Sequence, residues 1–227
     1  MDRWATFDCY GTLVDWNAGI HGELEKLFGV ELADGLLVRY HELEPTIQAA
    51  NPGASYREVL TLTLEALAAE TGLTLPEGET SALAQSLPTW PVFDDVRPGL
   101  TEAHGRGWKL GILSNTDRDL IDGSIEALGV PFEIAIVAGE IGSYKPAHKH
   151  WEVFYETTGA DRRGHVHVAQ SLFHDIGPAQ ELGIPSIWIN RLDEPDDPRP
   201  DATLTGVGEL ADALDDLAPK ESHAGSC

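Results

Sequence analysis

Apolar and polar positions follow two different rhythms along the chain. Residues 4–9 form a short, mostly apolar run that stops at a Tyr-Gly-Thr turn, which is typical of a buried strand. From about residue 17 to residue 87, apolar residues recur three and four positions apart, a spacing that predicts helices. Within this stretch Ser55 and Glu58 have the spacing of a capping box, so we expect a helix to begin there.

After residue 90, short apolar runs alternate with helical patterns. We expect strands near residues 109–113, 133–138, 165–169 and 186–190, and helices near residues 100–104, 117–128, 147–157, 177–182 and 208–217. Such alternation implies βαβ units and a doubly wound, Rossmann-like parallel sheet, so the fold class is α/β. Residues 1–15 and 91–227 are expected to form the core domain, with a helical cap domain inserted at residues 16–90.

Composition excludes several classes of function. The 227 residues include 38 acidic and 15 basic side chains, a formal net charge of −23, which disfavours nucleic-acid and anionic-membrane partners. No apolar run approaches the roughly 18–20 residues of a membrane span, and we expect no signal peptide. With two cysteines, Cys9 and Cys227, a disulfide framework is not expected, and the default location is the reducing cytoplasm.

Polar residues with chemical potential follow the predicted strands. Asp8 ends the first strand, Ser114 and Asn115 follow the second, Lys145 comes after the third, and Asp175 comes after the fourth. Because ligands bind at the carboxyl ends of parallel strands, we expect these side chains to gather at one edge of the sheet.

These residues, in this order, resemble the four motifs of the haloacid dehalogenase superfamily. The resemblance implies that Asp8 is a nucleophile that forms a covalent ester, with Thr12 and Ser114 donating hydrogen bonds to it or to a bound carboxylate. Lys145 would offset the charges of Asp8 and Asp175 and lower the pKa of both carboxyl groups. Asp175 would orient Lys145 and help to align the hydrolytic water.

Two positions separate the phosphatases of this superfamily from its dehalogenases. The phosphatases carry an acid where this chain has Tyr10, and a further acid, which helps to hold Mg²⁺, where it has Gln170. The run Asp8-Cys9-Tyr10-Gly11-Thr12 instead matches the first motif of the L-2-haloacid dehalogenases. We therefore expect no metal and no cofactor, with Mg²⁺ required only if the protein is a phosphatase.

The same resemblance implies a set of substrate-binding residues. An arginine on a cap helix, followed by a Leu-Glu pair, holds the substrate in that family, and Arg39 with Leu43 fits this pattern, with Tyr40 beside them. Asn115 is expected to donate to the substrate or the halide. Arg39 and Lys145 are expected to point into the cleft and to supply the positive charge that an anionic substrate needs.

The fourth motif departs from that of the dehalogenases. Ser171 is retained, but Leu172 replaces an asparagine and His174 replaces a tryptophan. His174 is open to three interpretations, as a cleft wall, a halide donor or a water activator. Tyr10 and the backbone of Cys9 are expected to line the site.

The expected function is hydrolysis of short (S)-2-haloalkanoic acids to 2-hydroxyalkanoic acids. Asp8 would displace the halide from C2, and water, oriented by Lys145, Asp175 and Ser171, would then hydrolyse the resulting ester. Two alternatives stay open: a Mg²⁺-dependent phosphatase acting on a small phosphorylated metabolite, and an inactive binding protein of the same fold. The resemblance also implies a homodimer.

Overall fold

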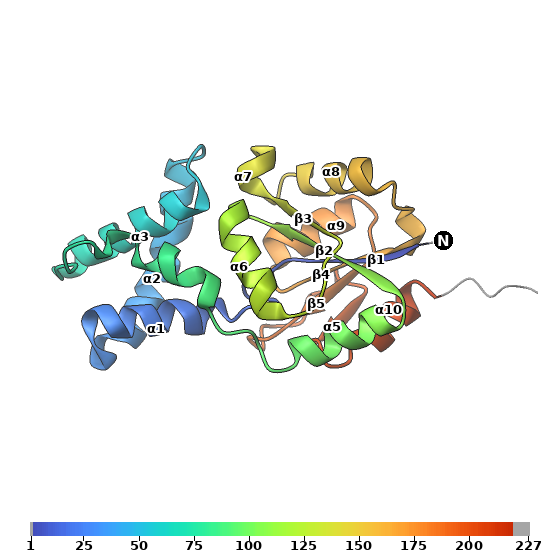
Figure 1. Ribbon diagram of the computed structural model, residues 1–227, viewed down its shortest axis with the longest axis horizontal. Helices are drawn as coiled ribbons and strands as arrows, with labels where there is room; N and C mark the ends of the chain where they lie inside the picture. Colours follow the sequence, from blue (N-terminus) through green and yellow to red (C-terminus); the bar gives the residue numbers. More distant parts are fainter. Residues whose placement is uncertain (1, 220–227) are drawn as a thin grey trace, which may run out of the picture.

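A computed structural model describes residues 2–219, so Cys227 and the rest of the C-terminal tail lie outside the described residues. Its centre is a six-stranded sheet in the order β3-β2-β1-β4-β5-β6, and every neighbouring pair is parallel (Figure 1). The strands are β1 (Arg3–Phe7), β2 (Trp108–Ser114), β3 (Ile134–Val137), β4 (His165–Ala169), β5 (Ser186–Ile189) and β6 (Ala202–Leu204). The predicted doubly wound α/β sheet is confirmed, and β6 is an addition that the sequence pattern did not reveal.

The strand order places a crevice at the middle of the sheet. The chain runs outward from β1 through β2 to β3, and then returns to the other side of β1 as β4. The strand order therefore reverses between β1 and β4. The connections that follow these two strands leave in opposite directions, which opens a crevice beyond the carboxyl ends of β1 and β4. Asp8 follows β1 directly and therefore stands at this crevice.

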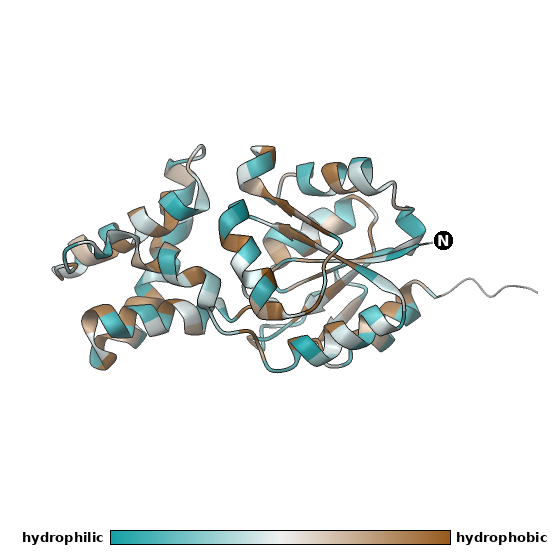
Figure 2. Cartoon of the chain, viewed as in Figure 1, coloured by the Kyte–Doolittle hydropathy of each residue, from teal (hydrophilic) through white to brown (hydrophobic). Residues whose placement is uncertain are grey.

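Helices cover both faces of the sheet (Figure 1). They are α5 (Val96–Gly105), α6 (Arg118–Leu128), α7 (Ala138–Ile141), α8 (Lys149–Thr158), α9 (Gly177–Glu181) and α10 (Leu210–Leu217). Because strand side chains alternate in direction, Phe7 joins the large core with α5, α6 and α10, whereas Trp4 packs with Trp151 and Phe154 of α8. Figure 2 shows the hydrophobic strands enclosed between helices whose outer surfaces are hydrophilic.

The expected helical block lies beside the sheet, and we call its helices the cap helices. They are α1 (Trp16–Phe28), α2 (Val30–Ala50), α3 (Tyr56–Thr71) and α4 (Ala82–Ser86). The predicted capping box is confirmed, since the Glu58 amide donates to Ser55 Oγ at 3.2 Å and the Ser55 amide donates to Glu58 Oε2 at 2.8 Å. No helix within residues 2–219 is both long enough and apolar enough to cross a membrane.

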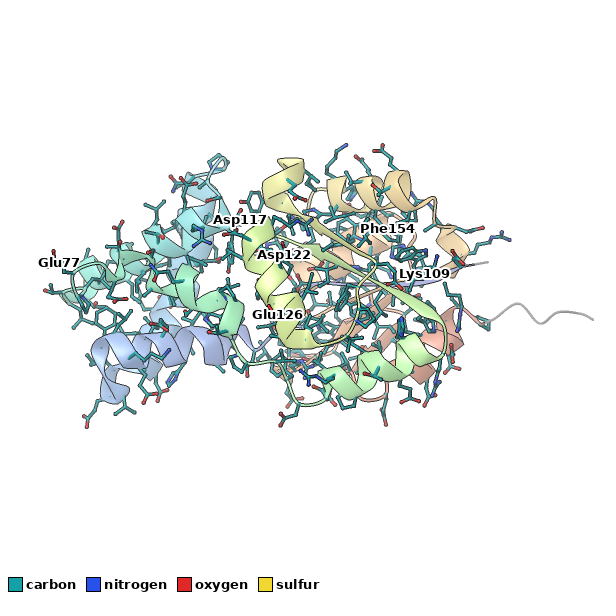
Figure 3. All side chains as sticks on the ribbon, in the orientation of Figure 1. Glu77, Lys109, Asp117, Asp122, Glu126 and Phe154 are labelled. Atoms are coloured by element: carbon teal, nitrogen blue, oxygen red, sulfur yellow. The ribbon has the colours of Figure 1, made fainter. Side chains whose placement is uncertain are left out.

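Hydrogen bonds at and just before the start of α3 join the cap helices to the core. The backbone N–H of Arg57 donates to Asp117 Oδ2 at 2.9 Å, and Figure 3 shows Asp117 where α6 approaches the cap helices. The Tyr144 hydroxyl donates to the carbonyl of Ala54 at 2.7 Å. Both contacts hold the start of α3 against the edge of the sheet, so residues of the cap helices cover the crevice.

Candidate active site

Three buried charged groups meet at the crevice. Lys145 Nζ donates to Asp8 Oδ1 at 2.9 Å, to Asp175 Oδ1 at 2.7 Å and to the carbonyl of Leu113 at 2.7 Å. An ammonium group has three N–H donors, so each hydrogen of Lys145 is engaged and its position is fixed. Asp175 lies on a short π-helical turn, Leu172–Ile176, and its Oδ2 is buried without a hydrogen-bond partner among the described residues.

The turn after β1 holds the Asp8 carboxylate in place. Thr12 Oγ1 donates to Asp8 Oδ2 at 3.0 Å and accepts from the Gln170 amide at 2.9 Å, so it links β1 to the end of β4. Gly11 adopts φ +88°, a conformation that a residue with a side chain reaches only with strain. The turn from Asp8 to Thr12 therefore holds the Asp8 carboxylate rigidly in place.

Asn115 fixes Lys145 from the neighbouring loop. Its Oδ1 accepts from the Lys145 amide at 2.7 Å and its Nδ2 donates to the Lys145 carbonyl at 3.0 Å. Asn115 also lines the cleft, so the residue expected to bind substrate positions the lysine as well. The adjacent Ser114 faces the cleft, and its hydroxyl has no hydrogen-bond partner within residues 2–219.

The two carboxyl groups differ in acidity. Burial raises the pKa of Asp8, and the nearby charge of Asp175 adds to this rise, against the opposing effects of Lys145 and Thr12. Burial also pushes the pKa of Asp175 upward, but Lys145 and His167 outweigh it and lower that pKa to about 2. Lys145 lowers the pKa of both carboxyl groups, as expected, but at Asp8 this effect does not offset the cost of burial, so the net shift of the Asp8 pKa is upward.

The cap side of the cleft contains groups that sequence reasoning missed. The cleft has a volume of about 280 Å³, and its cap wall consists of Trp16, Glu44, Pro45, Gln48 and Tyr56. Glu44 has no hydrogen bond or ion pair with any other described residue, and burial raises its pKa to about 7. A polar residue on the inner face of a helix is the signal that could have identified it.

On the cap helices, the structure corrects three of the predicted substrate contacts. Arg39 is 41% exposed and forms ion pairs with Glu42 and Glu70 instead of entering the cleft. Tyr40 and Leu43 are buried in the core among the cap helices and do not line the cleft. At 3.6 residues per turn, the face of α2 that carries Glu44 and Gln48 is roughly opposite to Arg39, which explains why Arg39 lies outside the cleft. The Arg-Leu-Glu pattern gave the right helix but the wrong face.

The other predicted residues are placed as follows. Tyr10 lines the cleft as predicted, and its hydroxyl lies 3.1 Å from Ser124 Oγ. The expectation for Cys9 is wrong, because Cys9 is fully buried and is not part of the cleft wall. Ser171 and His174 line the cleft together, with Ser171 Oγ 3.1 Å from His174 Nδ1. Burial lowers the pKa of His174, which favours the neutral ring.

A larger cavity of about 500 Å³ adjoins the cleft and shares Gly11, Trp16 and Gln170 with it. Asp8 does not line this cavity, so the chemistry belongs to the smaller cleft.

The donor set does not fit a magnesium ion. Within residues 2–219, no group of three or more His, Cys, Asp and Glu side chains is arranged to hold a metal. Asp8 and Asp175 each give one oxygen to Lys145, and Gln170 donates to Glu194 at 3.3 Å instead of supplying a third carboxylate. Mg²⁺ favours several hard oxygen ligands, and this site offers too few of them.

Comparison with known proteins agrees with this geometry. The (S)-2-haloacid dehalogenase of Pseudomonas sp. (strain YL) is 29% identical over 192 residues, which cover 82% of this chain and 81% of that enzyme. Haloacetate dehalogenase H-2 of Moraxella sp. (strain B) is 27% identical over 189 residues, 82% of this chain and 84% of that enzyme.

The fold is also found among solved structures. An L-2-haloacid dehalogenase from Xanthobacter autotrophicus, with chloropropionic acid covalently bound, matches with a TM-score of 0.82 at 17% identity, over 94% of this chain and 98% of that one. The family model for haloacid dehalogenase-like hydrolases matches residues 3–183, which include Asp8, Lys145 and Asp175. Because this match extends over well more than half of the chain, the chain belongs to the haloacid dehalogenase-like hydrolase family.

Proposed function

We propose that this protein hydrolyses the carbon–halogen bond of short (S)-2-haloalkanoic acids and releases 2-hydroxyalkanoic acids. The observation that carries the proposal is the Asp8 carboxylate, which faces the cleft and is held by Lys145 and Thr12, with Tyr10 where a phosphatase needs an acid. Displacement of a halide requires no proton for the leaving group, so a tyrosine at this position suits the reaction.

In the first step, an Asp8 oxygen attacks C2 of the substrate. A carbon–oxygen bond forms as the carbon–halogen bond breaks, and the halide leaves with the bonding electrons. The raised pKa of Asp8 makes its ionised form more nucleophilic than an ordinary carboxylate, while Lys145 keeps enough of that form available. The donors without partners at the cleft, the Ser114 hydroxyl and the Gln48 amide, are placed to bind the polar end of the substrate.

In the second step, water attacks the ester carbonyl carbon of Asp8. We assign Asp175 as the group that takes a proton from this water, because its Oδ2 is buried and without a partner at the cleft. The proton then passes to the departing alkoxide, which leaves as the 2-hydroxy acid. The remaining water hydrogen stays on the Asp8 carboxyl group and is lost to solvent, so Asp8 retains one oxygen from water.

The proposal is tested by incubating the enzyme with (S)-2-chloropropionate in H₂¹⁸O for a single turnover. We expect equal amounts of chloride and lactate, unaffected by EDTA, and ¹⁸O in the Asp8 peptide on mass spectrometry. Asp8→Asn is expected to abolish chloride release. Release of phosphate from phosphorylated metabolites that requires Mg²⁺, without chloride release, would replace the proposal with the phosphatase alternative.

We also propose that residues 16–90 form a cap domain on a core of residues 1–15 and 91–227, and that the protein is a homodimer. The exposed apolar residues Val30, Leu32 and Val38 on α2 support the dimer, since they are 65%, 44% and 63% exposed. Light scattering of the wild-type protein and of Val38→Glu would test it.

A further inference from the structure

A chain of buried hydrogen bonds runs behind the active site, from α8 through the sheet to Asp175. The Tyr155 hydroxyl lies 2.6 Å from His165 Nδ1, and His165 Nε2 lies 2.7 Å from Thr6 Oγ1. Thr6 Oγ1 lies 2.8 Å from His167 Nδ1, and His167 Nε2 lies 2.9 Å from Asp175 Oδ1. The path therefore crosses from β4 to β1 and back before it reaches the active site.

Each inner member of this chain is shielded from water. Thr6, His165 and His167 are fully buried, and only Tyr155 is half-buried at the outer end. His165 and His167 alternate along β4 and so point to the same face of the sheet, where α8 covers them. Trp151 packs edge-on against His167 with ring centroids 5.2 Å apart, and the ring centroid of Phe154 lies 4.7 Å from that of His165.

The direction of each hydrogen bond in this chain can be worked out from the Asp175 end. An ionised carboxylate only accepts, so His167 Nε2 carries a proton and donates to Asp175. A ring with its single proton at Nε2 accepts at Nδ1 from the Thr6 hydroxyl. Thr6 has one hydrogen to give, so it accepts from His165 Nε2–H, and His165 Nδ1 accepts from Tyr155.

The titration of His165 agrees with this order. Burial lowers the pKa of His165 well below its usual range, and the nearby charge of Arg162 adds to the effect. A neutral His165 has one N–H and one lone pair, as the chain requires.

We propose that His167, locked in its Nε2–H tautomer by Thr6, His165 and Tyr155, is a positioning residue for ester hydrolysis that keeps Asp175 ionised and leaves its Oδ2 free. The proposal extends the proposed dehalogenation, because Asp175 is the group assigned to take a proton from the hydrolytic water. Two donors, Lys145 Nζ and His167 Nε2, converge on Oδ1 of Asp175, whereas Oδ2 has no partner among the described residues. The carboxylate therefore cannot rotate without losing both hydrogen bonds.

Other charged groups also act on Asp175. Lys145 and Asp8 face it across the crevice, His174 is adjacent to it on the π-helical turn, and His150 of α8 lies nearby, with its pKa lowered to about 4. Burial keeps His150 and His174 neutral near pH 7, so Lys145 and His167 are the groups that stabilise the charged form of Asp175.

The tautomers are tested directly on the resting enzyme by NMR of ¹⁵N-histidine-labelled protein, assigned with His165→Gln and His167→Gln. We expect both rings to be neutral and protonated at Nε2 at pH 7, with His167 changing its tautomer mixture in Thr6→Val. A His167 ring protonated at Nδ1 in the wild-type protein would overturn the proposal. This measurement needs no substrate, so it stands even if dehalogenation is absent.

The effect on hydrolysis is tested by the amount of Asp8 ester that accumulates in the steady state with (S)-2-chloropropionate, measured by mass spectrometry. A hydrogen bond to a charged group contributes about 1.5–3 kcal/mol, so His167→Phe should slow ester hydrolysis about ten-fold or more. Thr6→Val, which leaves the His167–Asp175 contact in place, should slow it by a smaller factor. Ester formation should be unaffected. The acid limb of the pH–rate profile for ester hydrolysis should move to higher pH by about one unit, because Asp175 becomes easier to protonate.

Two matched variants separate positioning from packing. Thr63→Val removes a similarly buried hydroxyl, bonded to the Val59 carbonyl within α3, and should leave hydrolysis and its pH profile unchanged. His167→Gln retains an N–H donor and should restore most of the rate lost in His167→Phe. Equal slowing of ester formation and hydrolysis, or an unchanged acid limb in folded Thr6→Val, would contradict the proposal.

Discussion

Glu44 on α2 gives a stability prediction that can be worked out from the structure. Burial raises its pKa from an ordinary value of 4.5 to about 7, with no charged or polar partner to offset the effect. A carboxyl group with a raised folded-state pKa holds its proton more tightly in the folded state than in the unfolded state. Its contribution is therefore fully present below pH 4.5, declines between pH 4.5 and about 7, and is absent above that range.

The size of this effect follows from the pKa difference. A rise of about 2.5 corresponds to about 3 kcal/mol at most, and the half-buried position of Glu44 in the cleft reduces it to about 1–3 kcal/mol. Glu44→Gln keeps the shape of the side chain without a charge. We expect the variant to match the wild-type protein near pH 4.5 and to be more stable by about 1–3 kcal/mol at pH 8.

Urea denaturation of both proteins at several values between pH 4.5 and pH 8, followed by circular dichroism, measures the difference. Glu65→Gln is the matched control, because Glu65 is exposed on the neighbouring helix α3 and its replacement removes the same charge. A stability difference that does not change with pH, or that Glu65→Gln reproduces, would refute the assignment of a buried, unpaired carboxyl at Glu44.

Four further predictions concern charge and packing. Lys145→Met removes the cation that two buried carboxylates share, so we expect a loss of about 3–5 kcal/mol of stability at pH 7 in urea titrations and no detectable ester on mass spectrometry. Arg39→Ala should leave kcat/KM for 2-chloropropionate unchanged in a chloride-release assay, because Arg39 lies outside the cleft. Gly99→Ala should lower the thermal midpoint, since a Cβ there would lie 2.1 Å from the carbonyl oxygen of Val207. Added NaCl should raise kcat/KM for an anionic substrate in initial-rate assays, because it screens the repulsion by a net charge of −23.

The alternation of the second half of the chain was predictable because each buried strand is a short apolar run flanked by turn residues. The strand expected at residues 165–169 has those same bounds in the structure. The edge strand β6 escaped prediction because Ala202–Leu204 is three residues long and follows an acidic, proline-rich loop. The short helix α7 was also missed, since four residues carry no helical period.

The core side of the site was predictable for a different reason. A parallel sheet brings the residues after its strands to one edge, so topology alone places Asp8, Ser114 and Asp175 together. The cap side depends on the rotation of α2 about its axis, which the spacing of Arg39, Leu43 and Glu44 does not reveal. His167 was overlooked because a histidine inside an apolar strand has no sequence feature that distinguishes a hydrogen-bonded support from an ordinary core residue.

These placements change how an acidic protein would bind an anion. The sequence suggested two cleft cations, Arg39 and Lys145, but Arg39 is paired on the outer face and Lys145 is shared between two carboxylates. Among the described residues that line the cleft, no cation is left to attract a carboxylate. Binding must then come from neutral donors such as Ser114, and from the protonated form of Glu44 below about pH 7. In the proposed reaction, Lys145 would chiefly hold Asp8 and Asp175 in place, so its positive charge would act on these two carboxylates more than on the substrate.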